Sequence, residues 1–497
     1  MMLSALLQDI ASVSVEQDCE ITVMTIDSHE AVEGSLFVAL KGTQQHGLNF
    51  AEGVSKQGAS AIIWESDDAQ QAQDLSLPQI EVENLRDALG VIANRFYGSP
   101  SKNINVVGIT GTDGKTSVSH FLAQTLENCA VMGTLGIGQL TDLQTATHTT
   151  PDVLNTHKNI QNIKSKNNKT VAMEVSSHAL DQGRVAGVDF DVAVLTNLTR
   201  DHLDYHGTVE AYAEAKSKLF AWSDLKAMVL NLDDNFGREI GKKWGGGSFN
   251  PHSDQKTGLV IGYGIGAVAD YPENSLVAVN AEFNHSGLSA QIHYNDQQVD
   301  LNAAVLGRFN LSNLLAALGA MLALDYSLQD AVAELNKVQT VSGRIEKVSD
   351  ADVLAVVDYA HTPNALETVL KALREHTENQ LICVFGCGGD RDAGKRPLMA
   401  KIAEANADVV VVTDDNPRSE DPQTIMQDIV AGFDNPANVT VEHDRAAAIS
   451  AALNQAKSGD TVLIAGKGHE NVQILASGSI PFSDREQANK VLQELAA

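Results

Sequence analysis

The stretch GITGTDGKTS, residues 108–117, combines the residue types that bind a phosphate group. A Walker A phosphate loop has the spacing G-x-x-x-x-G-K-[ST]. Gly114, Lys115 and Thr116 fit the end of this pattern, but the leading glycine, Gly108, lies one residue too early. The stretch therefore predicts a phosphate site whose loop is one residue longer than the usual one.

The segments on either side of the loop have the patterns needed to position it. INVVGI, residues 104–109, predicts a buried strand, and TSVSHFLAQTLEN, residues 116–128, predicts a helix because its apolar residues recur at helical spacing. Gly111 and Gly114 allow the backbone to approach an anion, and a helix N-terminus offers free N–H groups and a positive dipole end. An ordinary strand-to-helix turn is the alternative, but Gly-Lys-Thr at such a turn favours phosphate binding.

Further polar residues follow apolar runs in the middle of the chain. Glu174 ends the run in VAMEVSSH, and Asn197 and His202 follow another in LTNLTRDHLDYHG. A carboxylate and an imidazole at strand ends beside a phosphate loop suit Mg²⁺ held on a triphosphate. A surface carboxylate and a structural histidine are the alternatives. Lys216 falls on the apolar face of a predicted helix, where a free ammonium is costly, unless it is simply solvated.

Charged residues also follow three apolar runs near the end of the chain. Arg391 lies in GCGGDRD, Arg418 in DDNPRSEDP and Glu470 in GKGHE. A guanidinium binds a carboxylate with two hydrogen bonds, and a glutamate can hold an ammonium group. Together these residues fit a zwitterionic amino acid, although each taken singly is more often part of a surface ion pair.

The composition narrows the class of protein. The chain has 497 residues, 43% of them apolar. It contains 35 Lys and Arg residues and 64 Asp and Glu residues, so its net charge is 35 − 64 = −29. This acidity argues against nucleic acid or an anionic membrane as a partner. The four cysteines are too scattered for a disulfide framework or a zinc site, and Cys383 and Cys387 are expected in a core. We find neither a signal-peptide pattern nor a membrane-spanning stretch, so a cytoplasmic location is expected.

The order of the patterns predicts the fold class. Short apolar runs alternate with helical patterns, which is typical of α/β proteins with parallel sheets covered on both faces. Boundaries are expected near residues 97–103 and 338–347. These boundaries predict three domains, residues 1–100, 101–338 and 339–497, each of ordinary size.

Eleven short motifs, in their order along the chain, resemble those of the Mur ligases of peptidoglycan synthesis. They are GTDGKTS, HTTPD, EVSSHAL, NLTRDHLDYHG, YAEAKSKLF, LGRFNLSN, VSGRIE, DYAHTP, GCGGDRDAGKRP, DDNPRSEDP and AGKGHE, and the resemblance extends over residues 27–486. The longer phosphate loop is itself the pattern of this family. The resemblance implies a UDP-substrate-binding domain, a central ATP-binding domain with a P-loop-type parallel sheet, and a C-terminal Rossmann-like domain that binds an amino acid.

The resemblance also implies a reaction. An ATP-dependent amide ligase would join meso-2,6-diaminopimelate to UDP-N-acetylmuramoyl-L-alanyl-D-glutamate through an acyl phosphate, with Mg²⁺ as cofactor and ATP as substrate. A monomer is expected. Three alternatives stay open: the same ligase chemistry with L-lysine, a ligase like folylpolyglutamate synthase, and a nucleotide-binding protein that kept the fold without the activity.

Site residues follow from the resemblance position by position. ATP is assigned to Gly111, Thr112, Asp113, Gly114, Lys115, Thr116, Ser117, Asn310, Asn313, Arg344 and Asp358. Mg²⁺ is assigned to Thr116, Glu174, His202 and Lys216, the last as a carbamate (N6-carboxylysine). The UDP-linked substrate is assigned to Ser28, Thr149, Thr150, Ser176, Gln182 and Arg184, and diaminopimelate to Arg391, Asp415, Asn416, Arg418, Gly466 and Glu470. The catalytic residues are Lys115, Glu174, His202 and Lys216.

Four positions depart from the pattern of the family. Asp113 stands where Asn is common, and Val472 stands where Tyr often follows GHE. His29 stands where Arg is usual, and QQHGLNF, residues 44–50, is a weakened form of DGHDF. The departures at His29 and Gln45 concern the contacts with uridine, not the reaction.

Overall fold

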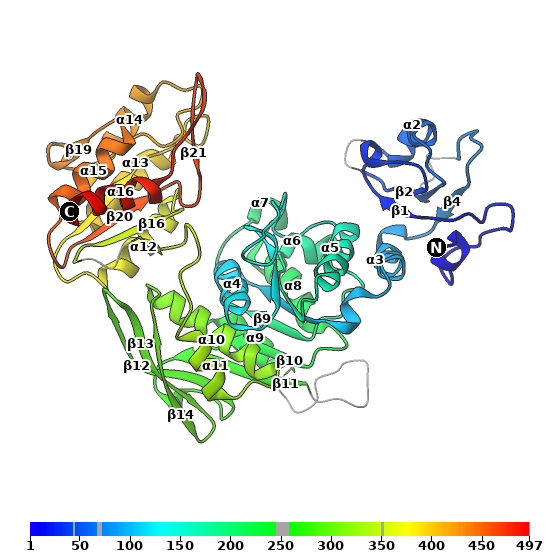
Figure 1. Ribbon diagram of the computed structural model, residues 1–497, viewed down its shortest axis with the longest axis horizontal. Coiled ribbons are helices and arrows are strands. Elements are labelled where there is room, and N and C mark those ends of the chain that lie inside the picture. Colours follow the sequence, from blue (N-terminus) through cyan, green and yellow to red (C-terminus); the bar gives the residue numbers. More distant parts are fainter. Residues whose placement is uncertain (43–44, 67–71, 245–257, 349–351, 497) are drawn as a thin grey trace. The chain divides into compact units, whose positions relative to one another are not determined.

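The computed structural model describes residues 1–42, 45–66, 72–244, 258–348 and 352–496. Two compact units, Met1–Ile261 and Gly262–Ala497, make up the chain, and each is described by itself. Strands alternate with helices along most of both units (Figure 1), so the α/β class predicted from the sequence is confirmed. The limits of the three predicted domains stay a prediction.

The first unit begins with a small sheet of four parallel strands in the order β1-β2-β3-β4. Its strands are β1 (Val23–Thr25), β2 (Ser35–Ala39), β3 (Ala61–Glu65) and β4 (Gln79–Val82). Alternate side chains of a strand point to opposite faces, so this sheet has two cores. One core packs against α1 (Leu3–Leu6) and α3 (Leu85–Phe96), and the other against α2 (Ala51–Lys56).

The larger sheet of the first unit carries the phosphate loop. Its strands lie in the order β7-β6-β8-β5-β9-β10, and all are parallel except β7. Their bounds are β5 (Asn105–Thr110), β6 (Cys129–Gly133), β7 (Gly136–Gly138), β8 (Thr170–Glu174), β9 (Val192–Leu195) and β10 (Ala227–Asn231). Helix α4 (Lys115–Thr125) packs against β5, β6 and β8. The remaining helices are α5 (Val153–Ser165), α6 (Ser177–Asp181), α7 (Leu203–His206), α8 (Val209–Ser217) and α9 (Asn235–Trp244).

The second unit begins with a pair of parallel strands that continues into an antiparallel ribbon. Strand β11 pairs with β12 in parallel, and β12, β13 and β14 are antiparallel neighbours. Their bounds are β11 (Leu259–Ile265), β12 (Ser275–Asn284), β13 (Gly287–Tyr294) and β14 (Gln297–Ala303), followed by α10 (Arg308–Ala323) and α11 (Leu328–Leu335). Helix α10 is apolar almost all round, which explains why most of its residues are buried.

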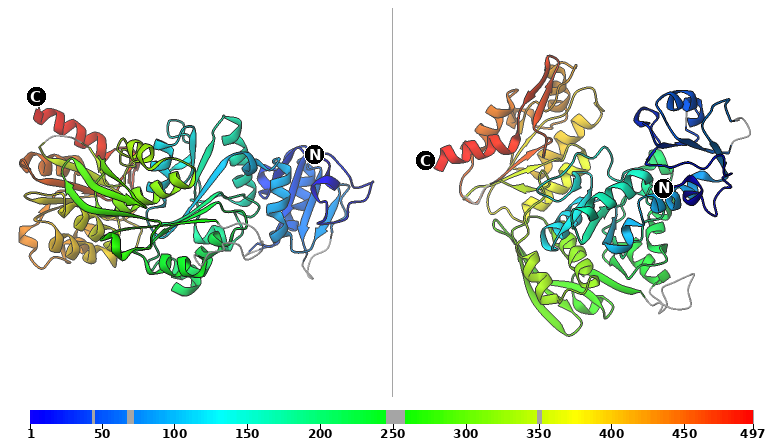
Figure 2. Two further views of the ribbon diagram at one scale, coloured as in Figure 1. Left: turned by 90° about the horizontal axis from the view of Figure 1, so that it is seen from below. Right: turned by 45° about the vertical axis from the view of Figure 1, so that its right-hand side comes forward.

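The C-terminal sheet has the order β15-β16-β20-β17-β18-β19, with β15 alone antiparallel. Its strands are β15 (Glu346–Lys347), β16 (Leu354–Asp358), β17 (Leu381–Phe385), β18 (Val409–Val412), β19 (Thr440–Val441) and β20 (Thr461–Ala465). One face packs against α12 (Pro363–Arg374), α13 (Lys395–Asn406) and α14 (Pro422–Val430), and the other against α15 (Arg445–Gln455) and α16 (Asp484–Ala496) (Figure 2). Cys383 and Cys387 lie in the first of these cores, as predicted.

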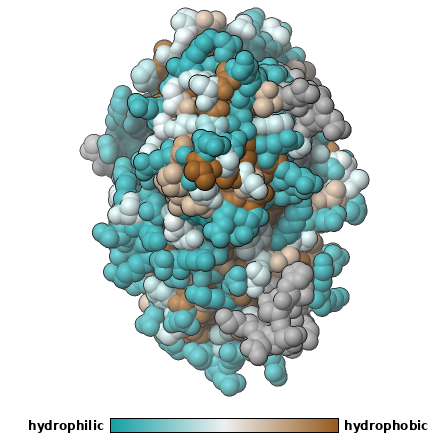
Figure 3. Space-filling model, turned by 90° about the vertical axis from the view of Figure 1, so that its right-hand side faces the viewer, coloured by the Kyte–Doolittle hydropathy of each residue, from teal (hydrophilic) through white to brown (hydrophobic). Residues whose placement is uncertain are grey.

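A short hairpin, β21 (Val472–Leu475) and β22 (Gly478–Pro481), follows β20. The surface in Figure 3 is mostly hydrophilic, with hydrophobic atoms gathered in small areas only. Within the described part of the chain, we find no helix of the length and hydrophobicity that a membrane span requires.

Candidate active site

The phosphate loop connects β5 to α4, as the sequence predicted. Gly111 has φ 152°, and a Cβ atom there would lie 1.8 Å from Oγ1 of Thr196. Gly114 precedes the helix with φ 85°, a left-handed conformation that glycine adopts without strain. Both glycines are therefore required by the backbone of the loop itself. The free N–H groups at the start of α4 form the anion-binding end of the helix.

Asn197, at the end of β9, holds the loop from the adjacent strand. Its side-chain Oδ1 accepts a hydrogen bond from the N–H of Asp113 at 3.0 Å, and its carbonyl accepts from the N–H of Thr112, also at 3.0 Å. Thr196 Oγ1 donates to the carbonyl of Asp113 at 2.6 Å. The loop is thus fixed by two residues of another strand before any ligand binds.

Lys115 folds back over the loop. Its Nζ donates to the carbonyl oxygens of Gly111 and Thr112 at 2.8 Å each. The charge therefore lies directly above the glycine-rich backbone, where a bound phosphate group would find both the ammonium and the amide N–H groups.

Thr116 and Glu174 form the oxygen-rich side of the site. Thr116 Oγ1 donates to Oε2 of Glu174 at 3.0 Å. Thr134 also holds this carboxylate, because its N–H donates to Oε1 at 2.9 Å and its hydroxyl to Oε2 at 3.2 Å. Burial raises the pKa of Glu174, while the nearby charge of Lys115 and the hydrogen bonds from both threonines oppose that rise. Glu174 is thus a structured interior carboxylate rather than a surface charge.

These two oxygen ligands fit Mg²⁺ in chemistry, since the ion prefers hard oxygens and usually keeps water and substrate phosphate in its other positions. Among the described residues, no cluster of three or more His, Cys, Asp or Glu side chains could hold a metal ion by itself. Any Mg²⁺ at Thr116 and Glu174 would therefore depend on the nucleotide for the rest of its ligands.

Lys216 is buried on α8, so the solvated alternative is wrong. Only 1% of it is exposed, and its Nζ donates to the carbonyl of Gly111 at 2.8 Å. The ammonium also lies 4.5 Å from the centre of the Tyr212 ring. Burial holds the pKa of Lys216 well below its usual value, and the charge of Lys115 lowers this pKa further. Lys216 thus loses its proton more readily than an exposed lysine does.

His202 lies apart from the other assigned metal ligands. Its side chain is 48% exposed and faces Asp201, with 3.5 Å between Nε2 and Oδ2. Its ring packs edge-on against His178, at 4.9 Å between centroids, and lies 6.0 Å from Tyr212. His202 and Lys216 thus both approach the ring of Tyr212. The structure shows no direct contact of His202 with Glu174 or Lys216.

The residues assigned to the UDP-linked substrate lie together, except for Ser28. Thr150 Oγ1 donates to the carbonyl of Glu174 at 2.8 Å and accepts from the N–H of Ser176 at 3.1 Å. Arg184 donates to the carbonyl of Thr150 at 3.1 Å and to Oε1 of Gln182 at 2.6 Å.

Thr149 reaches this group through the hydroxyl of Thr134, at 3.1 Å. Ser28 lies in the turn after β1, at the other sheet of the unit.

In the second unit, the residues assigned to the nucleotide are held by internal hydrogen bonds. Asn313 donates to Asn310, which donates to the carbonyl of Leu306, and both asparagines are buried in α10. Asp358 ends β16, and its two carboxylate oxygens accept from the backbone N–H groups of Ile345 and Ala360 at 2.7 Å each.

This carboxylate stabilises a strained turn. Ile345 has φ 45°, a left-handed conformation that a β-branched residue rarely adopts. Burial raises the pKa of Asp358, against the two backbone hydrogen bonds and the charge of Arg344. Arg344, the neighbour of Ile345, lies over the ring of Tyr359 at 5.4 Å. Asp358 therefore positions Arg344 as well as being a candidate ligand itself.

The predicted amino-acid site lies at the carboxyl ends of β17, β18 and β20. Parallel strands end at the same edge of a sheet, so the loops that follow them meet there. Asn416 donates to Oε2 of Glu470 at 2.9 Å, and Arg418 Nη1 donates to the carbonyl of Gly389 at 2.9 Å. Gly466 has φ 119°, and a Cβ atom there would lie 2.7 Å from Oδ2 of Asp415. Arg418 Nη1 also donates to the carbonyl of Asn416 at 3.4 Å. Five of the six assigned residues thus contact or closely approach another member, namely Asp415, Asn416, Arg418, Gly466 and Glu470.

Arg391 does not join this group in the structure. It is exposed, and its guanidinium donates to the carbonyl of Asp390 at 3.2 Å. Burial opposes the ionisation of Glu470, but the hydrogen bonds from Asn416 and Lys467 outweigh it and lower the pKa of Glu470. Glu470 and Arg418 each hydrogen-bond to Asn416, through its side chain and its carbonyl respectively.

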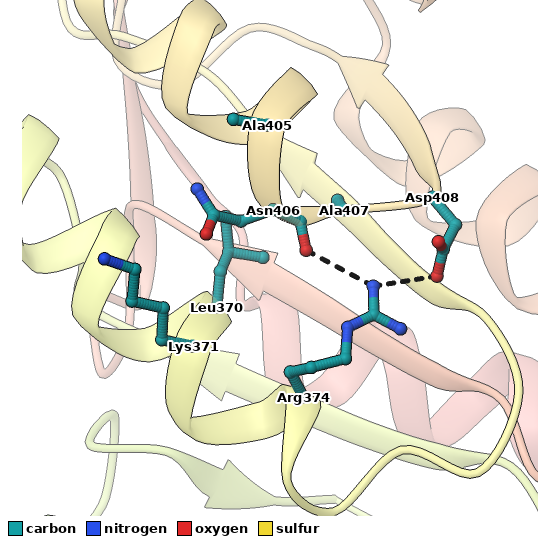
Figure 4. A pocket seen from close by; sticks show the side chains of 7 residues that line it. All are labelled: Leu370, Lys371, Arg374, Ala405, Asn406, Ala407 and Asp408. Carbon is teal, nitrogen blue, oxygen red and sulfur yellow. Dashed lines mark hydrogen bonds and ion pairs between the residues drawn. The ribbon is translucent and has the colours of Figure 1, made fainter.

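A pocket of about 510 Å³ opens between the C-terminal ends of α12 and α13, and it contains none of the assigned residues (Figure 4). Its most prominent charges are already paired, because Arg374 donates to Asp408 at 2.8 Å and to the carbonyl of Asn406 at 3.3 Å. It lies beside the start of β18, away from the carboxyl ends of the strands. Lys371, which also lines the pocket, forms an ion pair with Glu367.

Two contributors to these sites were not assigned from the sequence. Thr134 lies in the turn between β6 and β7, and no local signal marks it. Lys467 is fully buried between Asn416 and Glu470, and only its place in AGKGHE could have indicated it.

Comparison with known proteins gives matches over most of the chain. Family models match at residues 20–97 (Mur ligase family, catalytic domain), 109–321 (Mur ligase middle domain) and 343–468 (Mur ligase, glutamate ligase domain).

Two curated relatives are named UDP-N-acetylmuramoyl-L-alanyl-D-glutamate–2,6-diaminopimelate ligase. The protein of Ectopseudomonas mendocina (strain ymp) is 46% identical over 96% of each chain. The protein of Xylella fastidiosa (strain Temecula1 / ATCC 700964) is 44% identical over 100% of this chain and 98% of the relative. A solved structure of a ligase with the same name aligns with a TM-score of 0.76 at 35% identity, and 96% of each chain is covered.

Proposed function

The chain belongs to the Mur ligase family, and from this premise we propose that it is an ATP-dependent amide ligase that adds meso-2,6-diaminopimelate to UDP-N-acetylmuramoyl-L-alanyl-D-glutamate. One observation carries the choice of substrates: the relative from E. mendocina, 46% identical over 96% of this chain, bears the name of that ligase. The phosphate loop supports ATP as the second substrate. The reaction belongs to peptidoglycan precursor synthesis, which we place in the cytoplasm, and we propose a monomer.

The chemistry requires an activated carboxyl group. The carboxylate of the D-glutamyl residue attacks the γ-phosphorus of ATP, so that an acyl phosphate forms and ADP leaves. The amine of diaminopimelate then attacks the acyl carbon, and phosphate leaves as the amide forms. Most of the acceleration in phosphoryl transfer comes from positioning and charge neutralisation. We assign neutralisation of the β- and γ-phosphates to Lys115, which lies over the loop backbone.

Thr116 and Glu174 would hold Mg²⁺ beside the phosphates, where the ion would neutralise their charge. Lys216 is proposed to be carbamylated. Its neutral amine attacks CO₂, one proton is released, and the side chain becomes a carboxylate of charge −1. The supporting observation is burial at 1% exposure next to Lys115, which disfavours a second ammonium there.

Specificity for the amino acid is proposed to depend on Arg418 and Glu470. Diaminopimelate and L-lysine differ by one carboxylate at the distal carbon, and a guanidinium left without that carboxylate is costly. Arg391 is proposed as a further ligand although it is exposed in the structure. L-lysine ligation remains the second candidate, because the surroundings of Arg418 alone do not exclude it.

The domain limits are also part of the proposal. A UDP-substrate domain (1–100), an ATP-binding domain (101–338) and an amino-acid-binding domain (339–497) are supported by three family-model matches that end or begin near residues 97–109 and 321–343.

A phosphate-release assay tests the function. The purified chain is given ATP, Mg²⁺ and the UDP-linked dipeptide with diaminopimelate, L-lysine or L-glutamate, and the products are identified by mass. We expect product with diaminopimelate and a kcat/KM at least about 100-fold lower with L-lysine. Arg418→Ala should lose most of this preference, whereas Arg374→Ala, in an exposed ion pair, should keep it. Equal kcat/KM for the two amino acids would exclude the proposed substrate.

A further inference from the structure

Lys467 is a buried lysine to which the proposed reaction assigns no role. It follows β20, and 0% of it is exposed. A buried ammonium is costly unless it is paired and hydrogen-bonded. Its position in the amino-acid site therefore needs an explanation beyond the filling of space.

The partners of Lys467 are two residues of that site. Its Nζ donates to Oδ1 of Asn416 at 3.0 Å and to Oε2 of Glu470 at 3.0 Å. Asn416 Nδ2 donates to the same Oε2 at 2.9 Å. The three side chains thus form a closed ring of hydrogen bonds, which we call the Lys467 ring (Asn416, Lys467 and Glu470).

The hairpin β21–β22 fixes the ring from one side. Ile474 N–H donates to Oδ1 of Asn416 at 3.0 Å, and the Ile474 carbonyl accepts from the N–H of Arg418 at 3.0 Å. Gln473 Nε2 donates to the carbonyl of Asp415 at 2.8 Å. The orientation of the Asn416 amide is determined by these contacts, because Oδ1 faces two donors and Nδ2 faces the carboxylate.

The ring leaves one oxygen of Glu470 available. Two donors occupy Oε2, whereas within the described part of the chain no hydrogen bond to Oε1 is found. The side chain of Glu470 is 29% exposed, so the carboxylate has a path to solvent while its other end is anchored inside. Such a group is oriented for a cation that arrives from outside.

We propose that Lys467 is a positioning residue for the amino-acid substrate: it anchors Oε2 of Glu470 and directs Oε1 toward the ammonium group of that substrate. This inference rests on the proposed function. A lysine that served only to stabilise the loops would support binding of all substrates alike, which gives the two roles different kinetic consequences.

The first test replaces the charge and keeps the shape. In the full chain, Lys467→Met should raise KM for diaminopimelate by about 10- to 100-fold, the range found when a residue that supports a direct ligand is lost. KM for ATP and for the UDP-linked dipeptide should change by less than about 2-fold. Lys401→Met, an exposed lysine on α13, is the matched control and should behave as the wild type. An unchanged KM for diaminopimelate, or an equal rise in all three values, would overturn the proposal.

The second test asks whether Lys467 acts through Glu470. In a Glu470→Gln background, Lys467→Met should change KM for diaminopimelate by less than about 3-fold, because the group it positions has lost its charge. Independent, multiplying effects of the two substitutions would contradict the proposal. If Lys467→Met does not fold, Lys467→Leu takes its place in both tests, since it likewise removes the hydrogen bonds to Asn416 and Glu470.

The assay also separates this inference from the proposed function. If the wild type accepts L-lysine instead of diaminopimelate, the proposed substrate is wrong, and the same variants are then measured with L-lysine. If it accepts neither amino acid, both proposals fail. If it accepts diaminopimelate and Lys467→Met does so equally well, only the role of Lys467 is refuted.

Discussion

Lys115 and Lys216 donate hydrogen bonds to the same atom, the carbonyl oxygen of Gly111, both at 2.8 Å. Two ammonium groups this close repel each other, and the buried one is the more costly to charge. Burial and the charge of Lys115 together lower the pKa of Lys216. The predicted roles of the two lysines differ accordingly.

Removal of the loop cation should prevent turnover. Lys115→Ala deletes a charge that neutralises developing phosphate charge, and we expect kcat to fall by at least about 100-fold. Lys102→Ala, an exposed lysine of the same unit, is the control and should keep wild-type activity. Steady-state phosphate release measures both variants, and a Lys115→Ala enzyme within about 10-fold of wild type would refute the assignment of the loop.

The activity of the enzyme should depend on CO₂ if Lys216 is carbamylated. If Lys216 acts as a carbamate, removal of CO₂ and bicarbonate from the buffer should lower activity reversibly, because carbamate formation is an equilibrium. Lys216→Ala should be nearly inactive and partly restored by short carboxylates such as acetate, which carry the missing charge. Restoration by small amines instead would show that the positive charge was what mattered.

At the scale of elements, the junction of β5, the loop and α4 depends on a close contact with β9. Gly111 is the point of closest approach, because any Cβ atom there would meet Oγ1 of Thr196 at 1.8 Å. Thr196 in turn donates to the carbonyl of Asp113, so a shift at this point would disturb the hydrogen bonds that shape the loop.

Gly111→Ala should therefore weaken both the fold and nucleotide binding. Overpacking at a tight contact costs about 1–3 kcal/mol of unfolding free energy, and we expect the affinity for ATP to fall by at least about 10-fold. Gly53→Ala is the matched control, since a Cβ atom in that helix meets nothing within 4 Å. Denaturant unfolding and nucleotide titration measure the two effects, and wild-type behaviour of Gly111→Ala would contradict the described loop.

At the scale of the whole molecule, buried histidines in both units make stability depend on pH. Burial lowers the pKa of His120 to about 4, and it also lowers the pKa values of His157 and His376. His376 is 1% exposed, and its Nε2 accepts from the N–H of Gly307 at 2.8 Å while Nδ1 lies 2.6 Å from the carbonyl of Asn284. A proton on Nε2 would remove the first of these hydrogen bonds.

The directions of these pKa shifts determine whether the free energy of unfolding rises or falls with pH. A histidine with a lowered pKa in the folded state contributes its stability fully above the unfolded value of about 6.5, and that contribution is lost as pH falls toward the folded value. Glu174 and Asp358 have raised pKa values and act in the opposite direction, so a comparison of variants is needed.

The unfolding free energy of wild type minus that of His376→Gln should be largest above pH 7 and shrink between pH 6.5 and 5. His361→Gln, at an exposed position, is the control. A difference independent of pH would refute the prediction.

The sequence by itself determined the elements and the chemistry of the loop. Apolar runs and helical spacing are local patterns, so they predicted β5, α4 and the alternation of strands with helices that is typical of parallel sheets. The positions of Lys115, Glu174 and Glu470 at the ends of such runs were sufficient to place them at the carboxyl edges of sheets. The eleven motifs predicted the family, and the comparisons confirmed it.

Only the tertiary structure decided which distant residues touch. Lys216 and Gly111 are 105 residues apart, and Thr116 and Glu174 are 58 apart. Such contacts depend on strand order and on how helices cover the sheet, which no local pattern encodes. For the same reason the sequence could not show that Lys216 is buried, that His202 is half exposed, or that both oxygens of Asp358 bind backbone N–H groups. Burial sets the cost of a charge, and burial is a property of the folded chain.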